Sequence, residues 1–363
     1  MPARRRIVVN GKFLSAEPTG VHRVAAELVR HAHRLLAEDA QAAAQLEMAL
    51  WVPRDGRDGA ERLGVPYEQV GPLRGIPWEQ LTLPLKARGR TILSLCNVGP
   101  VLARDAVTMF HDAQVHITPQ SYSPAFRTWY HLHQPLAGRR HRRILTVSGY
   151  SREQLALHGL APRAKIGVIH NGVDHVLDIP ADDGVIERLA LEPRRYAVAL
   201  ANTQAHKNVG LLLRAFADPA LRGLRLVLFG GAGRGAFEAA GWTVPDNVVF
   251  AGRIGDGELR ALYTHALCIA FPSTTEGFGL PPLEAMLVGC PAIVAPCGAL
   301  PEVCGAAALQ AGPEDPAAWV AALRRLADDA PAREGLGRAA AAHAATFTWA
   351  KAARRLLDEL LAL

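Results

Sequence analysis

Residues 271–286 read FPSTTEGFGLPPLEAM, and this stretch says more about the fold than any other. An apolar strand ending at Phe271 leads into a loop with two glycines. A helix then starts with two prolines, whose missing N–H groups cost nothing in a first helical turn. This order brings backbone N–H groups and the positive end of a helix dipole to one point at the carboxyl edge of a parallel sheet. The stretch therefore predicts an anion site, best suited to phosphate, in an α/β fold.

Two glutamates flank this predicted anion site. Glu276 lies in the loop, and Glu284 is expected in the first helical turn, with seven residues between them. A carboxylate does not bind phosphate, so both side chains are expected to accept hydrogen bonds from hydroxyl groups of a ribose or a sugar. The structural alternative is that Glu284 complements the helix dipole and Glu276 caps the turn.

The rest of the chain alternates short apolar strands with amphipathic helices, which is typical of parallel sheets covered on both faces. The expected strands are 7–9, 46–52, 91–95, 107–110, 144–147, 166–169, 196–200, 224–229, 248–250, 267–271 and 292–295. Helices are expected after residue 20 and near 207–217, 256–265, 280–289, 315–328 and 331–346. The pattern predicts two doubly wound α/β domains, with the seam near residues 170–174.

Length and charge agree with two domains. The 363 residues are too many for one ordinary core. Residues 1–175 hold 23 Lys and Arg against 14 Asp and Glu, whereas the remainder holds 17 against 20. A basic first half suits polyanions, phosphorylated lipids or an anionic membrane. The chain has no signal-peptide pattern and no apolar run long enough to span a bilayer, and its five cysteines have no C-x-x-C spacing. A reducing, cytoplasmic location is therefore expected.

The motifs together resemble a known family. The E-x7-E spacing of Glu276 and Glu284, within EGFGLPPLEAM, resembles the retaining GT-B glycosyltransferases of family 4, in the branch rich in bacterial polysaccharide mannosyltransferases. Further motifs with family counterparts are SGYS at 148–151, NGVD at 171–174, HKN at 206–208, FAGR at 250–253 and LPEV at 300–303. The resemblance covers roughly residues 145–305, and the preceding part matches only in pattern.

The resemblance implies a GT-B architecture, with two Rossmann-like domains facing across a cleft. The first, 1–172, would bind the acceptor, and the second, 173–346, the nucleotide-sugar donor. Residues 347–363 would form a C-terminal helix that crosses back to the first domain.

Roles in the donor domain follow from the same resemblance. Lys207 matches the lysine that neutralises the donor diphosphate, although a solvated lysine is the alternative. His206 departs from the usual arginine, and Arg253 could supply that second charge or could only pair with a surface acid. Glu284 matches the residue that holds the ribose. The other expected donor contacts are Glu276 with the backbone of Gly277, Phe278, Gly279 and Leu280, together with Ile254 beside the base and Asn202.

Two residues of the first domain complete the predicted site. Gly20, at a helix start, would let backbone approach the diphosphate, or it could belong to an ordinary helix-entry turn. His111 ends a strand at the carboxyl edge and matches residues that lie beside the reacting sugar carbon in relatives. The alternative is that His111 satisfies a loop carbonyl.

Two other segments suggest different functions. Residues 231–236 read GAGRGA, which fits a dinucleotide fingerprint, but no acid follows the next strand, so only an NADP enzyme with Arg253 at the 2′-phosphate stays open. Residues 129–143 combine aromatic and basic side chains and could bind RNA, a membrane surface or a lipid diphosphate, or form a solvated basic helix.

The function expected from these observations is transfer of a hexose, with its anomeric configuration retained, from a nucleotide diphosphate sugar to a saccharide or polyprenyl-diphosphate-linked acceptor in surface polysaccharide synthesis. GDP-mannose is the first candidate donor. No metal, cofactor or nucleic acid is expected, and the enzyme would lie in the cytoplasm or on the inner face of its membrane. A nucleotide-sugar epimerase and a non-enzymatic binder of nucleotide sugars or nucleic acids remain as alternatives.

Overall fold

The computed structural model describes residues 4–363 and divides into two compact units. The first unit runs up to Gly172 and also contains Thr348–Leu363, whereas the second unit is Val173–Phe347. Each unit has its own sheet and core, and each is described by itself.

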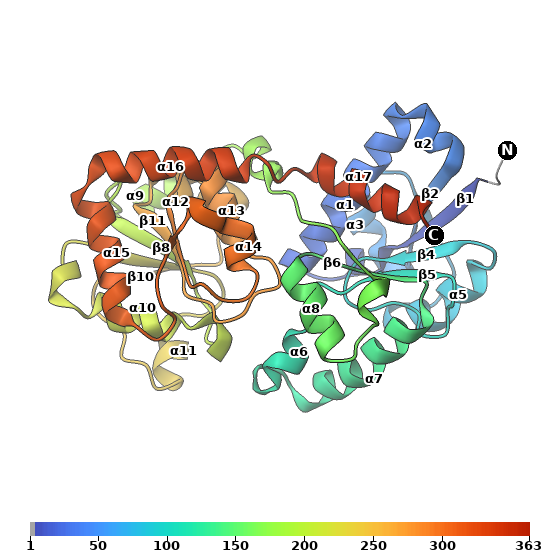
Figure 1. Cartoon of the computed structure of the whole chain (residues 1–363), viewed down its shortest axis with the longest axis horizontal. Coiled ribbons are helices and arrows are strands. Elements are labelled where there is room, and N and C mark those ends of the chain that lie inside the picture. Colours follow the sequence, from blue (N-terminus) through green and yellow to red (C-terminus); the bar gives the residue numbers. More distant parts are fainter. Residues whose placement is uncertain (1–3) are drawn as a thin grey trace. The chain divides into compact units, whose positions relative to one another are not determined.

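The first unit is built on a seven-stranded sheet in the order β3-β2-β1-β4-β5-β6-β7, with every neighbouring pair parallel. Its strands are β1 (Arg5–Asn10), β2 (Leu46–Val52), β3 (Tyr67–Gln69), β4 (Thr91–Ser94), β5 (Ala106–Met109), β6 (Arg143–Thr146) and β7 (Ile166–Val168). The inner strands are apolar because helices cover both faces (Figure 1).

The helices of the first unit are α1 (Gly20–Glu38), α2 (Ala40–Gln45), α3 (Arg57–Leu63), α4 (Gly75–Pro77), α5 (Leu83–Lys86), α6 (Gln114–Ile117), α7 (Pro124–Arg140), α8 (Gly149–Leu157) and α17 (Trp349–Leu361). A π-helical turn, Trp78–Thr82, precedes α5. The C-terminal helix α17 packs along α1 (Figure 1). Arg143 ties it to the sheet through an ion pair with Glu359, whose atoms are 2.7 Å apart.

The second unit has a six-stranded sheet in the order β10-β9-β8-β11-β12-β13, again with parallel neighbours. Its strands are β8 (Tyr196–Leu200), β9 (Arg225–Phe229), β10 (Val248–Gly252), β11 (Cys268–Phe271), β12 (Ala292–Val294) and β13 (Leu309–Gln310). Its helices are α9 (Gly184–Arg188), α10 (Val209–Phe216), α11 (Arg234–Ala239), α12 (Asp256–His265), α13 (Leu280–Leu287), α14 (Leu300–Cys304), α15 (Pro316–Asp328) and α16 (Ala330–Ala344).

The predicted fold class, α/β with two doubly wound parallel sheets, is confirmed. All eleven expected strands are present, with ends that differ by at most two residues. The sequence prediction lacked β3 and β13, which are edge strands of three and two residues. Their side chains are half-buried or exposed, so neither strand carries the continuous apolar run that marks a buried strand.

Candidate active site

The second sheet reverses its strand order between β8 and β11. The chain adds β9 and β10 on one side of β8, and it adds β12 and β13 on the far side of β11. Open α/β sheets bind ligands at the carboxyl ends of the strands at such a switch point. Residues 201–208 and 272–279 are the loops that leave these two neighbouring strands.

An ion pair joins the two loops. Lys207 Nζ lies 2.7 Å from Glu276 Oε1, and both side chains are largely buried, with 18% and 11% of their surface exposed. The Thr274 N–H donates to the carbonyl of His206 over 2.8 Å. The structure thus brings together Lys207 and Glu276, which the sequence analysis assigned to the same ligand from separate motifs. An ammonium group has three donors, so Lys207 can bind Glu276 and still donate to a second anion.

His206 is buried and cannot supply the second cation that an arginine would provide. Burial, together with the neighbouring Lys207 cation, lowers the pKa of His206 to about 4. The imidazole is therefore neutral at neutral pH. Its loop is fixed by Asn208, which adopts a left-handed conformation and whose side-chain amide donates to the carbonyls of Pro272 and Pro313.

Arg253 follows β10, two strands away from the switch point. Its guanidinium packs beside Gly231, where an added Cβ would lie 3.4 Å from Nε. Arg253 is exposed, and within residues 4–363 no carboxylate forms an ion pair with it. The alternative of a surface ion pair is therefore wrong for this arginine, which leaves its charge available to a ligand.

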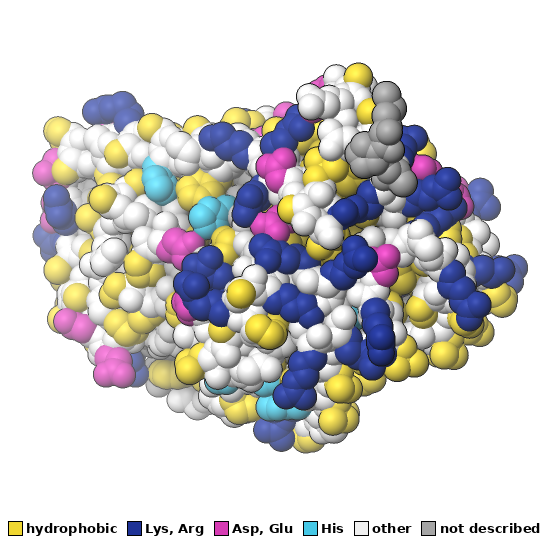
Figure 2. Space-filling view, turned by 45° about the vertical axis from the view of Figure 1, so that its right-hand side comes forward, with side chains coloured by type: hydrophobic (Ala, Val, Ile, Leu, Met, Phe, Trp, Pro, Cys, Tyr) yellow, Lys and Arg dark blue, Asp and Glu magenta, His cyan; other side chains and the backbone are white. Residues whose placement is uncertain are grey.

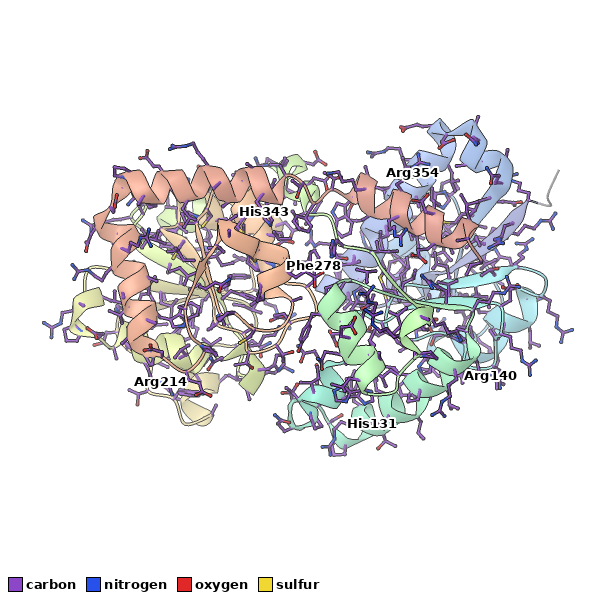
Figure 3. The ribbon with its side chains drawn as sticks, viewed as in Figure 1. His131, Arg140, Arg214, Phe278, His343 and Arg354 are labelled. Atoms are coloured by element: carbon purple, nitrogen blue, oxygen red, sulfur yellow. The ribbon has the colours of Figure 1, made fainter. Side chains whose placement is uncertain are left out.

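Contacts with residues 298, 299 and 347 fix the position of the glycine loop after β11. The carbonyl of Glu276 accepts from Ala299 N over 3.0 Å, and Gly298 packs so tightly that a Cβ there would lie 2.4 Å from Glu276 N. The buried ring of Phe278, which is labelled in Figure 3, packs edge-to-face on Phe347, with 6.0 Å between the ring centroids. Phe278 therefore anchors the loop with its side chain, so only its backbone is suited to a ligand contact.

Glu284 lies deeper in its helix than predicted. α13 begins at Leu280, so Glu284 is the fifth residue and belongs to the second turn, not the first. The prolines occupy the first turn as expected. Glu284 is largely buried, and its Oε1 lies 3.4 Å from Nε2 of His175. Since a dipole effect fades beyond the first turn, simple complementation of the helix dipole is a weaker explanation for this carboxylate.

The remaining predicted donor contacts lie on the same carboxyl edge. Asn202 shapes the turn after β8, since its Oδ1 accepts from Gln204 N over 2.8 Å. Ile254 is half-buried between β10 and α12. Gly279 precedes α13 with a φ of 104° and packs against Leu300, where an added Cβ would lie 2.7 Å from Cδ2.

Comparison with known proteins identifies the family. Residues 194–329 match the family model described as glycosyl transferases group 1. The O-antigen chain mannosyltransferase B of Escherichia coli is 31% identical over 257 residues, which are 67% of each chain. The chain belongs to the group 1 family of glycosyl transferases. The D-inositol 3-phosphate glycosyltransferase of Streptomyces avermitilis is 32% identical over 60% of this chain. The matched part covers 51% of that relative's own length.

Solved structures support the GT-B fold of this glycosyltransferase. Anabaena HepE, in complex with UDP and glucose, superposes with a TM-score of 0.71 at 17% identity, covering 99% of this chain and 100% of that one. WaaG, a glycosyltransferase involved in lipopolysaccharide biosynthesis, gives a TM-score of 0.66 at 15% identity over 98% and 99% of the chains. At these identities, the likeness concerns the fold alone.

Within the first unit of the glycosyltransferase, Gly20 is the first residue of α1 and is exposed. Thr19 precedes Gly20 at the N-cap position, but its side chain accepts no hydrogen bond from the first turn of α1. The backbone N–H groups of that turn therefore receive no cap from Thr19. His111 follows β5 and is buried. Its Nε2 donates to the carbonyl of Leu95 over 2.8 Å, as the structural alternative proposed. Burial lowers the pKa of His111 to about 4, so the ring is neutral and Nδ1 is an acceptor.

Glu79 of the glycosyltransferase is a candidate functional residue that was not predicted from the sequence. This carboxylate is fully buried in the π-helical turn of the first unit, and its Oε2 lies 2.6 Å from Lys12 Nζ. The sequence signal is weak because Glu79 is a single acid in an apolar stretch, 67 residues from Lys12.

The basic segment 129–143 lies in the first unit. Most of it is helix α7, but Arg142 pairs with Asp105 over 3.2 Å and Arg143 pairs with Glu359 over 2.7 Å. Both arginines follow the end of α7 and make ion pairs, whereas Arg139 and Arg140 lie in the last turn of that helix. The GAGRGA stretch follows β9, one strand away from the switch point where a dinucleotide fingerprint would bind.

Within residues 4–363, no group of three or more His, Cys, Asp or Glu side chains is arranged to hold a metal ion. In the same residues, none of the helices is both long and apolar enough to cross a membrane.

Proposed function

We propose that this glycosyltransferase moves a hexose from a nucleotide diphosphate sugar to a saccharide or lipid-linked saccharide during surface polysaccharide synthesis, and that it retains the anomeric configuration. Mannose from GDP-mannose is the first candidate. This choice is supported by two relatives, the O-antigen chain mannosyltransferase B of Escherichia coli and the O-antigen chain mannosyltransferase RfbU of Salmonella typhimurium, which is 26% identical over 69% of this chain.

The observation that carries the proposal is the ion pair between Lys207 and Glu276 at the switch point of the second sheet. Lys207 donates to the donor diphosphate while it keeps its bond to Glu276. Negative charge grows on the leaving diphosphate in the transition state, and a fixed ammonium group in a largely buried site stabilises that charge without reorganisation. Arg253 adds a second positive charge from the end of β10.

The other residues bind the donor's neutral parts. The Glu276 carboxylate accepts hydrogen bonds from the sugar hydroxyls, and the backbone N–H groups of residues 277–280 donate hydrogen bonds to them. Glu284 holds the two ribose hydroxyls, because a buried carboxylate is a strong acceptor with two oxygens. Ile254 and Asn202 border the nucleotide.

Retention is proposed to occur on the front face of the sugar, where the departing phosphate takes the acceptor's proton. A side-chain base is then not needed. His111 is neutral, so it can face the reacting sugar without adding charge, and its Nδ1 can accept a hydrogen bond. Lys207, Arg253 and the helix dipoles take the place of a metal ion in this proposal.

The experiment that tests the function is turnover followed by NMR. The protein is incubated with GDP-mannose, UDP-glucose or dTDP-rhamnose and with mannose-terminated oligosaccharides. The proposal expects a new glycoside with the same anomeric configuration as the donor. An inverted product would contradict the retaining mechanism. Epimerised nucleotide sugar without a glycoside would identify an epimerase instead.

We also propose that the first unit binds an anionic membrane surface, as suits a lipid-linked acceptor. Leu81, Leu85 and Leu102 are 53%, 59% and 70% exposed around a cavity of about 360 Å³. Arg88 and Arg104 line this cavity, and neither forms an ion pair with a described carboxylate. Figure 2 shows Lys and Arg side chains gathered with apolar ones over this unit. Each basic side chain near such a surface contributes about 1 kcal/mol.

Vesicle co-sedimentation tests the membrane proposal. Replacing Arg88, Arg104 and Arg140 with Gln should reduce binding to anionic vesicles, because these arginines have no carboxylate partner among residues 4–363. Replacing Arg195, Arg222 and Arg338 of the second unit is the matched control. Equal binding to neutral and anionic vesicles would contradict the proposal, and a soluble acceptor would then be favoured.

A further inference from the structure

The second unit has a cavity at the amino edge of its sheet, the edge opposite the proposed donor site. The cavity has a volume of about 490 Å³. Arg194 lies just before β8 and Pro291 just before β12, so both mark the amino ends of their strands. The rest of the lining comes from the residues after α13 and from α16, two helices that pack against each other (Figure 1). The second unit therefore supplies the whole lining.

A close contact fixes the wall that α16 forms. Gly337 is buried, and an added Cβ there would lie 2.6 Å from the carbonyl oxygen of Gly289. Gly289 has a φ of 80° and belongs to the turn between α13 and β12. Arg333 and Ala341 lie one helical turn before and after Gly337, so they share its face of α16 and line the same cavity.

Three arginines line the cavity, and the structure holds two of them in place. Arg194 has a φ of 62°, which is uncommon for a residue other than glycine, and its guanidinium donates to the carbonyl of Ala266 after α12. The Arg333 guanidinium donates to the carbonyl of Leu326 in the last turn of α15 over 2.9 Å. Arg338 is the third and is exposed on α16. Two guanidinium groups are thus oriented before any ligand binds.

Helix capping alone does not use the donors of these arginines. A guanidinium group has five N–H donors, and the capping bonds of Arg194 and Arg333 use one donor each. Within residues 4–363, no carboxylate forms an ion pair with Arg194, Arg333 or Arg338. Glu334 is the one acid among the described lining residues. Three arginines against one glutamate leave an excess of two positive charges, which attracts an anion.

The lining indicates which anion fits. Guanidinium groups match the oxygens of phosphate with paired N–H donors, and a phosphate monoester carries close to two negative charges, like the excess in the cavity. Glu334 would repel a second anionic group, but it can accept hydrogen bonds from hydroxyl groups. The cavity is larger than a phosphate ion needs and lies within the roughly 300–1,000 Å³ of small-molecule sites. A sugar phosphate combines these properties.

We infer that the amino edge of the second sheet binds a sugar phosphate. Arg194, Arg333 and Arg338 bind its phosphate, and Glu334 accepts from its hydroxyl groups. The site is separate from the proposed donor site, because α13 begins beside the glycine loop and ends beside this cavity. The eight residues of α13 place its two ends about 12 Å apart. Binding at this site does not depend on the proposed function.

Calorimetric titration with mannose 6-phosphate tests the site. The wild type should bind one equivalent. Arg338→Gln should bind at least about ten-fold more weakly, the scale of one lost charged hydrogen bond. Arg222→Gln is the matched control, since Arg222 is also an exposed arginine of the second unit but does not line the cavity. Equal affinities in Arg338→Gln and Arg222→Gln would overturn the inference.

A second variant separates a shaped site from general attraction to a basic surface. Ala341 is half-buried in the lining, so Ala341→Phe fills part of the cavity and leaves all three arginines in place. Mannose 6-phosphate should raise the Tm of the wild type, because it binds only the folded state, and should not raise the Tm of Ala341→Phe. The same melting curves show whether each variant folds. A similar rise in Tm in both proteins would contradict a site inside the cavity.

Two further titrations identify the place and the ligand. Lys207→Ala should bind mannose 6-phosphate like the wild type, since Lys207 lies at the other edge of the sheet. Loss of binding in this variant would assign the ligand to the donor site and overturn the inference. Inorganic phosphate should bind at least about ten-fold more weakly than mannose 6-phosphate, because it lacks hydroxyl groups for Glu334. Equal affinities would overturn the assignment to a sugar phosphate. A failure of sugar transfer would remove only the proposed function.

Discussion

Lys207 and Glu276 form an ion pair across the switch point of the second sheet, with 2.7 Å between their atoms, although they are 69 residues apart in sequence. The pair exists because β8 and β11 are neighbours, so the loops after them start side by side. A buried ammonium group that is already held by a carboxylate keeps its position when a ligand binds. This preorganisation is the physical basis of the proposed donor site.

Lys207→Ala should lower turnover more than donor affinity. The lost ammonium acts mainly on charge that develops on the leaving diphosphate, so kcat should fall about 100-fold, the scale of one lost electrostatic donor. Steady-state kinetics with the accepted donor measure this change. Arg222→Ala removes an exposed cation from the loop before β9, at the opposite edge of the sheet, and should leave kcat unchanged. A Lys207→Ala enzyme within a few-fold of the wild type would rule out this role.

Glu284→Ala should weaken donor binding. The ribose hydroxyls lose a charged acceptor, at a cost of about 1.5–3 kcal/mol, or roughly 10- to 150-fold in Kd. Calorimetric titration with the free nucleoside diphosphate measures the loss without turnover. Glu187→Ala, which removes an exposed carboxylate on α9, serves as the control. If the folded Glu284 variant keeps its nucleotide affinity, the residue does not belong to the site.

Gly298→Ala should displace the glycine loop. Gly298 has a φ of 62°, and its added Cβ would lie 2.4 Å from Glu276 N. Gly289→Ala is the matched control, because Gly289 also has a positive φ, of 80°, but no atom lies within 4 Å of its added Cβ. Both changes introduce left-handed strain of about 1–2 kcal/mol, but only Gly298→Ala also pushes on Glu276. Unfolding should show a loss of stability in both variants, whereas donor affinity should fall only in Gly298→Ala. Equal donor affinities would show that the loop position does not matter.

Acidification should destabilise the protein between about pH 6.5 and 4. Burial lowers the pKa of His206 and of His141 to about 4. Between the usual histidine pKa and this value, the unfolded state binds more protons than the folded state, so stability falls as the pH falls. Thermal unfolding of the wild type and of His206→Gln at several pH values measures this effect. In this pH range, the free energy of unfolding should depend on pH less steeply in the variant than in the wild type. The difference in slope should correspond to one proton, or about 1.4 kcal/mol per pH unit. Identical slopes would contradict a neutral, buried His206.

Much of the fold could be predicted from sequence because the inner strands are buried on both faces. Leu46–Val52 and Tyr196–Leu200 were predicted at their observed bounds, since the second is a continuous apolar run and the first is apolar except for Glu47. Tyr67–Gln69 could not be predicted, because an edge strand of three partly exposed residues has no such run.

The site was only partly predictable. Residues 271–286 marked the donor loop because its glycines, prolines and glutamates are adjacent in sequence. The partnership of Lys207 with Glu276 depends on strand order, which local patterns do not contain. Glu79 was missed for the same reason, as its partners Lys12 and Asn10 lie on another element. The helix start near residue 280 was predicted correctly, but Glu284 was assigned to the wrong turn, since the fifth residue of a helix already belongs to its second turn.

The most direct test of the account is one calorimetric series. GDP-mannose, UDP-glucose, dTDP-rhamnose and a short oligonucleotide are titrated into the wild type, the Glu284→Ala variant and the Glu187→Ala control. The account predicts that one nucleotide sugar binds to the wild type and the control and binds at least about ten-fold more weakly to Glu284→Ala. Binding of the oligonucleotide alone, or of a nucleotide sugar with equal affinity in all three proteins, would contradict a donor site at the switch point of the second sheet.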